Sequence, residues 1–156
     1  MKHFLTLMLL IFTGVFSAFA DGVPEYDIEG NGTGNQGTYL VKVSVITKNK
    51  KIDDSELVKA AVHGVLFRGF SSKEHRQNQR PVAGSPAVEA QHADYFNSFF
   101  GDVGAYRNYG QTVGGSRAVV KSGKKYRVSA TVTVNKDQLR KDLEQAGVVR
   151  GLNSGF

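Results

Sequence analysis

Two segments of this chain, Tyr39–Thr47 and Lys125–Asn135, alternate their side chains with a period of two and are rich in valine and threonine. Successive side chains of a β-strand point to opposite faces, so each segment is predicted to be a strand with one better-buried face. Each is followed by apolar residues at helical spacing, over 55–66 and over 136–147. A strand buried on one face needs a covering layer, and a helix supplies one. These two strand–helix units constrain the fold most.

The residues at the expected helix starts agree with this spacing. Asp53, Asp54 and Ser55 are of the types that cap a helix N-terminus, and Glu56 places negative charge in the first turn. Asn135 occupies the capping position before the second helix. Capping and spacing therefore predict the same boundaries.

Other segments give weaker signals. Residues 86–100 repeat apolar and aromatic residues at intervals of three and four, which predicts a further helix. Its aromatic face is expected to pack in the core, with a ligand platform as the alternative. Residues 117–121 and a following glycine turn predict a strand that precedes the second alternating segment. Residues 71–86 and the glycine-rich 101–115 lack apolar periodicity and are expected to be irregular.

These elements predict an α+β domain with a single antiparallel or mixed sheet of about three to five strands and two or three helices mainly on one face. The two strand–helix units also echo each other. Both strands open on a Tyr-x-Val triplet, both helices contain Leu-x-Lys, and both lead to Arg-Gly, at 68–69 and 150–151. Two pseudo-repeated strand–helix units and coincidence are both open interpretations of this echo.

The first 20 residues have the composition of a secretory signal peptide. Lys2 precedes an apolar run from Phe4 to Phe16, and the segment ends at Ala18-Phe19-Ala20. The run is shorter than the roughly 20 residues of a membrane span, which disfavours the alternative of an anchor. We expect cleavage after about Ala20 and export to the periplasm or the extracellular space. The domains are then a signal peptide at 1–20, an arm or linker at 21–37 and a single α+β domain at 38–156.

The chain contains no cysteine, so it forms no disulfide and offers no thiol for catalysis or lipid attachment. An exported protein without disulfides is stabilised by its hydrophobic core alone. This composition favours a bacterial envelope over a eukaryotic secretory route.

Charge is unevenly distributed in this basic chain, whose formal net charge is +6. Residues 21–37 hold Asp21, Glu25, Asp27 and Glu29 and no basic residue, and they end in a glycine-rich run. We interpret this segment as an extended acidic arm, because a phosphate-binding loop would follow a buried strand and precede a helix. The basic remainder suits anionic partners such as lipopolysaccharide, acidic glycans or nucleic acid, although solubility explains it equally well.

One string is distinctive: Ala61-Val62-His63-Gly64-Val65-Leu66-Phe67-Arg68-Gly69, followed by Gln79-Arg80-Pro81 and an aromatic stretch at 94–100. On these residues the chain resembles a family of small exported proteins of Bacteroidota, largely uncharacterised. The resemblance covers most of 38–151. It implies a bacterial envelope location, and it implies no reaction, cofactor or catalytic residue.

Catalytic and metal-binding motifs are scarce. The sequence has neither the His-Glu-x-x-His motif of zinc peptidases nor the Gly-x-Ser-x-Gly motif of serine hydrolases. His63, His75 and His92 are widely spaced and could form a metal site with Asp94 only if a long loop folded back. The alternative is that the histidines pack separately. We expect no catalytic residue, no metal site and no cofactor.

The candidate binding residues are basic and aromatic. Arginine and tyrosine recognise planar anions and glycans, although they are also ordinary loop residues. Five candidates cluster in the loop at 68–80 and three lie in the second irregular segment: Arg68, Lys73, His75, Arg76 and Arg80, with Tyr106, Arg107 and Tyr109.

Three classes of function fit these features. The first is a non-catalytic envelope protein that binds a partner or helps an assembly. The second is a module that binds an anionic glycan or lipid through the loop at 68–80, and the third is a secreted hydrolase, which needs carboxylates that converge in a cleft. The partner is unknown. The candidates are an envelope protein, an anionic glycan and an anionic lipid. We expect no nucleic-acid partner, because no base-reading motif is present, and no transmembrane segment after cleavage.

Overall fold

A computed structural model describes residues 22–151 of the protein. The expected signal peptide and its cleavage position lie outside these described residues, as do residues 152–156. The described chain is an α+β fold, as predicted, with a five-stranded antiparallel sheet and a separate two-stranded sheet. The elements in chain order are β1 Tyr26–Gly30, β2 Tyr39–Thr47, α1 Asp54–Phe67, β3 Phe70–Ser72, β4 Gln77–Gln79, α2 Ala87–Gln91, α3 Ala93–Phe99, a 3-10 turn η1 Ala105–Asn108, β5 Gly110–Thr112, β6 Ala118–Ser122, β7 Lys125–Val134 and α4 Lys136–Gln145.

The two alternating segments form the centre of the main sheet. β2 and β7 pair antiparallel along their length, from Tyr39 opposite Val134 to Thr47 opposite Tyr126. β1 pairs with the outer side of β2, while β5 and β6 pair with successive parts of β7. The inward side chains of β2 and β7 are buried, which confirms the predicted strands: Val41, Val43, Val45, Val128, Ala130, Val132 and Val134.

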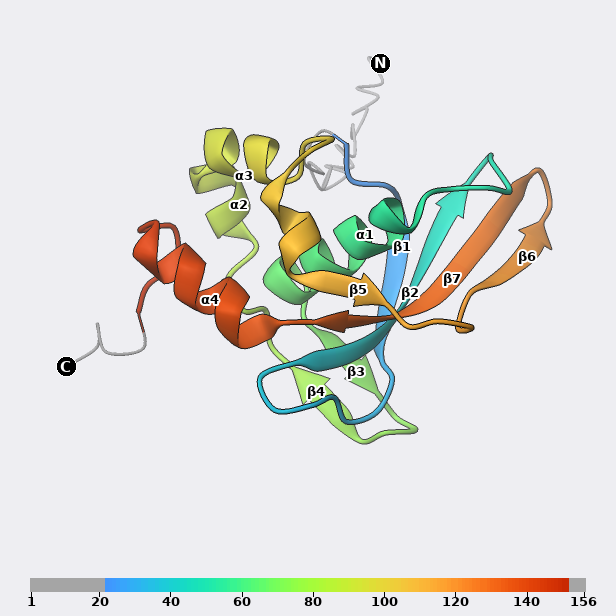
Figure 1. Cartoon of the computed structure of the whole chain (residues 1–156), viewed down its shortest axis with the longest axis horizontal. Helices are drawn as coiled ribbons and strands as arrows, with labels where there is room; N and C mark the ends of the chain where they lie inside the picture. The colour runs from blue at the N-terminus through green and yellow to red at the C-terminus, as the bar shows by residue number, and fades with distance from the viewer. Residues whose placement is uncertain (1–21, 152–156) are drawn as a thin grey trace, which may run out of the picture.

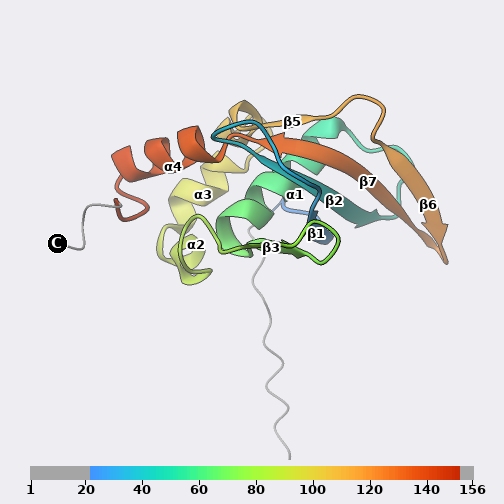
Figure 2. The ribbon, with the colours of Figure 1, turned by 90° about the horizontal axis from the view of Figure 1, so that it is seen from below.

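Helix α1 covers one face of this sheet, and α2 and α3 lie on the same side (Figure 2). α1 is buried from Leu57 to Phe67, so its apolar residues meet the sheet on one side and the α3 aromatics on the other. Phe96 and Phe100 pack with Phe67 in the core, and Phe99 packs with both of them, as predicted. The core therefore lies between the sheet and these helices.

Helix α4 begins as predicted, because the Asn135 side chain accepts a hydrogen bond from the Gln138 amide at 3.3 Å. Its Leu139 and Leu143 are buried. α4 extends beyond the end of β7 (Figures 1 and 2), whereas α1 covers the sheet. The units β2–α1 and β7–α4 thus share their order of elements but not the placement of their helices.

The prediction of an arm at 21–37 is wrong for residues 26–30, which form β1 at the edge of the main sheet. Tyr26 points inward and is buried, while Asp27 and Glu29 point outward. The outward acids meet cations of β2 and β7: Glu29 lies 3.5 Å from Lys42 and Asp27 lies 2.6 Å from Arg127. A short strand with an acidic outer side resembles a solvated linker in composition, which explains the error.

Three other segments differ from expectation, and one of them is the glycine-rich 101–115, which contains η1 and β5. The loop predicted at 71–86 contains the β3–β4 hairpin, whose three-residue strands are too short to show periodicity. The helix predicted at 86–100 is divided into α2 and α3, because His92 leaves helical geometry with φ −123° and ψ 41°. Within residues 22–151, no helix has the length and apolar character needed to cross a bilayer.

Candidate functional site

The basic residues predicted from the sequence do not form one site. Lys73, His75 and Arg76 are exposed in the turn between β3 and β4, and Arg80 is exposed just after β4. Arg68 instead contacts β1, where its guanidinium lies 4.1 Å from the centre of the Tyr26 ring and donates to the Tyr26 carbonyl at 3.0 Å. Arg68 is therefore occupied in joining α1 to the sheet edge.

The second group of predicted residues lies in a different part of the fold. Tyr106 is fully buried, and its hydroxyl has no hydrogen-bond partner among the described residues. Arg107 donates to the Asp102 carbonyl. Tyr109 is half-buried and donates to the Asp142 carboxylate of α4 at 2.8 Å. Tyr106 is thus unavailable to a ligand, and Tyr109 links η1 to α4.

The Tyr109 contact has a consequence for alkaline stability. Burial, followed by the hydrogen bond to Asp142, raises the pKa of Tyr109 to about 12. The phenol keeps its proton in the folded chain above pH 10 but loses it in the unfolded chain, so the stabilisation is complete below pH 10 and is lost between about pH 10 and 12. In urea titrations, Tyr109→Phe should be less stable than the wild type at pH 8, and the difference should shrink by pH 11. A constant difference would contradict this assignment.

The three histidines of 22–151 lie apart. His63 is buried in α1, His75 is in the β3–β4 turn, and His92 lies between α2 and α3. Within the described residues, no three histidine, aspartate or glutamate side chains are placed to hold a metal ion. The alternative of separately packed histidines matches this arrangement.

His63 joins three elements through its two ring nitrogens. Its Nδ1 lies 2.6 Å from the Tyr26 hydroxyl of β1, and its Nε2 lies 3.0 Å from the Glu89 carboxylate of α2. A carboxylate only accepts hydrogen bonds, so Nε2 donates to Glu89; in the neutral imidazole Nδ1 then accepts from the Tyr26 hydroxyl, whose pKa is raised by burial. Tyr26 and His63 are each 3 % exposed. A substrate could not reach this hydroxyl. The hydrogen-bonded chain from Tyr26 through His63 to Glu89 therefore stabilises the fold.

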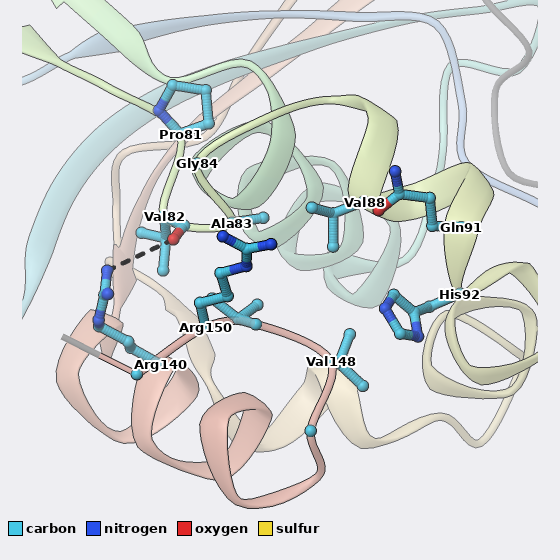
Figure 3. Close-up of a pocket in the computed structure, with 13 residues that line it drawn as sticks. Pro81, Val82, Ala83, Gly84, Val88, Gln91, His92, Arg140, Val148 and Arg150 are labelled. Carbon is cyan, nitrogen blue, oxygen red and sulfur yellow. Dashed lines mark hydrogen bonds between the residues drawn. The ribbon is translucent and has the colours of Figure 1, made fainter. Parts of the chain in front are cut away.

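A cavity of about 770 Å³ lies between the loop that precedes α2, α2 itself and the segment that follows α4 (Figure 3). This volume falls in the range of small-molecule sites. Val82 and Ala83 form one wall, and their amides bond to the Val65 and Leu66 carbonyls of α1 at 3.0 Å. Val88 and Val148 add apolar surface from α2 and the C-terminal segment. The cavity is therefore attached to the core helix.

The charged residues that line this cavity are all basic. Arg140 and Arg150 line it together with His92, and no acidic residue does. Arg140 is held in place, because its Nε donates to Glu144 at 2.7 Å and its Nη1 to the Val82 carbonyl at 3.5 Å (Figure 3). Arg150 projects into the cavity and forms no hydrogen bond or ion pair with residues 22–151. The site thus combines an unneutralised guanidinium with an apolar wall.

The sequence did not indicate this site. Arg140 and Arg150 belong to no recognised motif, and Arg150-Gly151 is only part of the internal echo. Their approach to 81–84 depends on where α4 lies, which local patterns do not report. Comparison with protein-family models, with curated proteins and with solved structures finds no match for this chain.

Proposed function

We propose that the chain is an exported, non-catalytic binding module of the bacterial envelope whose cavity takes an anionic ligand with an apolar part. The observation that carries this proposal is Arg150, a guanidinium that has no counter-ion among residues 22–151 and lies in a cavity without described acidic lining. A guanidinium in that position is better satisfied with a bound anion than without one. The ligand supplies the charge that residues 22–151 do not.

The cavity also specifies the chemistry of the ligand. Arginine presents a planar set of donors that matches a carboxylate or a phosphate in two parallel hydrogen bonds. Arg140 is already paired with Glu144, which leaves Arg150 as the guanidinium available to the anion. The valine side chains of the wall suit a short alkyl chain or another apolar group. An alkyl phosphate or a fatty acid has both features.

The location in this proposal rests on the leader at 1–20 and on the absence of cysteine. The resemblance to exported Bacteroidota proteins stays a prediction, and it implies the same envelope location. Binding, rather than hydrolysis, is favoured because the hydroxyl–imidazole–carboxylate arrangement at Tyr26 is buried. Anion binding through the loop at 68–80 also stays a prediction, and the experiment below separates it from binding in the cavity.

Isothermal titration calorimetry with decyl phosphate as the probe tests the proposal. The chain comprising residues 21–156 should bind the probe, and Arg150→Gln should weaken binding about tenfold or more, because a charge-assisted contact is lost. Arg80→Gln is the matched control, since Arg80 is exposed like Arg150 and carries the same charge, but it lies in the predicted loop and does not line the cavity. Decyl maltoside, which has the same alkyl chain without the anion, should bind more weakly.

Two outcomes would contradict the proposal. If Arg80→Gln weakens binding as much as Arg150→Gln, the anion site lies in the loop or reflects net charge alone. If the wild type binds decyl phosphate no better than decyl maltoside, the cavity does not recognise an anion.

A further inference from the structure

One end of the main sheet gathers six lysines from two loops. β2 pairs with β7 so that Thr47 lies opposite Tyr126, and the loop that leaves β2 therefore begins beside the β6–β7 turn (Figure 1). The turn itself is tight, with Ser122 opposite Lys125. All six lysines are exposed, and we call them the lysine end of the sheet: Lys48, Lys50, Lys51, Lys121, Lys124 and Lys125.

These charges are largely uncompensated within residues 22–151. Lys125 lies 3.7 Å from Glu25, and the side chains of the other five lysines form no ion pair or hydrogen bond with the described part of the chain. The acids nearest in sequence do not change this balance. Asp54 is bound by Arg117 at 2.7 Å, and Asp53 is a single charge at the start of α1. The lysine end is therefore a local surplus of positive charge.

Apolar side chains are exposed on the strand that leads into the same turn. β6 lies at the free edge of the sheet, and all five of its residues are exposed. Val119 is 39 % exposed and Val120 is 60 % exposed, immediately before Lys121. Lysine at a strand edge prevents unwanted pairing, which accounts for Lys121 alone. It accounts for neither the five lysines outside β6 nor the exposed valines.

We propose that the lysine end docks on an anionic lipid surface, with the lysines over the headgroups and Val120 at the headgroup boundary. All six cations are lysines, which act as mobile point charges suited to a diffuse field of phosphates rather than to a fixed bidentate ligand. The exposed valines add the apolar contact that a soluble polyanion would not use. This surface lies at the opposite end of the molecule from α4 (Figure 1), so the inference does not depend on the ligand cavity.

Vesicle co-sedimentation tests this inference. The chain comprising residues 21–156 should bind vesicles of phosphatidylcholine and phosphatidylglycerol and should not bind vesicles of phosphatidylcholine alone. Each lysine near an anionic surface raises partitioning about fivefold, so Lys50→Gln, Lys121→Gln and Lys124→Gln together should lower it by about a hundredfold. Val120→Asn should lower it further with the charge unchanged.

The matched control removes three charges from the β3–β4 region, as Lys73→Gln, Arg76→Gln and Arg80→Gln, and should leave most of the vesicle binding intact. Equal losses in the two triple variants would mean that net charge alone governs binding, and the inference would fail. It would also fail if Val120→Asn had no effect while heparin bound the wild type through the same three lysines, since that result identifies a soluble polyanion as the partner. Circular dichroism of each variant confirms folding.

Discussion

Replacing Gly69 with alanine is expected to lower the free energy of unfolding by about 4 kcal/mol, because two costs add at this position. Gly69 follows α1 with φ 68°, and its amide donates to the Gly64 carbonyl at 2.9 Å. An added Cβ would overlap the Gln79 carbonyl oxygen and would lie 3.0 Å from the Pro81 nitrogen. Both neighbours are backbone atoms, so the clash is relieved only by displacing β4 from the end of α1.

Gly84→Ala is the matched control for this prediction. Gly84 has φ 81°, and an added Cβ would have no atom within 4 Å. Gly84→Ala should therefore lower the free energy of unfolding by about 1 kcal/mol, which is the cost of placing alanine in the left-handed region without a clash. Urea denaturation followed by circular dichroism measures both variants. Equal losses would show that the approach of β4 to Gly69 is not as close as described.

The second large effect is expected at His63. His63→Ala should lower the free energy of unfolding by about 3–5 kcal/mol, since it opens space in the core and leaves two polar groups without partners. The groups are the Tyr26 hydroxyl, buried in β1, and the Glu89 carboxylate, whose side chain is 16 % exposed. The rings of Phe67 and Phe100 lie about the imidazole, with centroids 5.1 Å and 5.4 Å from it. These rings limit the access of water, so water does not fully replace the hydrogen bonds that the Tyr26 hydroxyl and the Glu89 carboxylate lose.

Two further variants make the His63 result interpretable. Tyr26→Phe removes one hydroxyl and should cost about 1–3 kcal/mol, because the Nδ1 acceptor is left unsatisfied. His75→Ala, at an exposed turn, should change stability by less than about 0.5 kcal/mol. If His63→Ala and His75→Ala cost the same in urea denaturation, the imidazole does not join β1 to α2 as described.

The elements that the sequence predicted are those with long periodic patterns. β2 and β7 show period-two alternation over nine and ten residues. α1 and α4 have helical spacing and capping residues at their starts. β3, β4 and β5 have three residues each, too few for a pattern to emerge. The break at His92 has no local signal, because neither proline nor glycine marks it.

The distribution of charge is explained by tertiary pairing. The acidic segment that was expected to be a solvated arm becomes β1, whose Asp27 and Glu29 neutralise cations on β2 and β7. Arg150 in the cavity and five of the six lysines at the lysine end lack such partners within residues 22–151. The sequence shows an acidic segment and a basic remainder, but only the register of the strands determines which cations are neutralised. The candidate site could not be predicted for the same reason.

The ligand cavity is tested most directly by two-dimensional NMR of the isotopically labelled chain comprising residues 21–156 during a titration with decyl phosphate. We expect the amide signals that shift to belong to residues that line the cavity, at 82–84, 88, 91–92 and 147–151. These shifts should be lost in Arg150→Gln. Shifts confined to 73–80, or shifts that persist unchanged in Arg150→Gln, would contradict the proposed site.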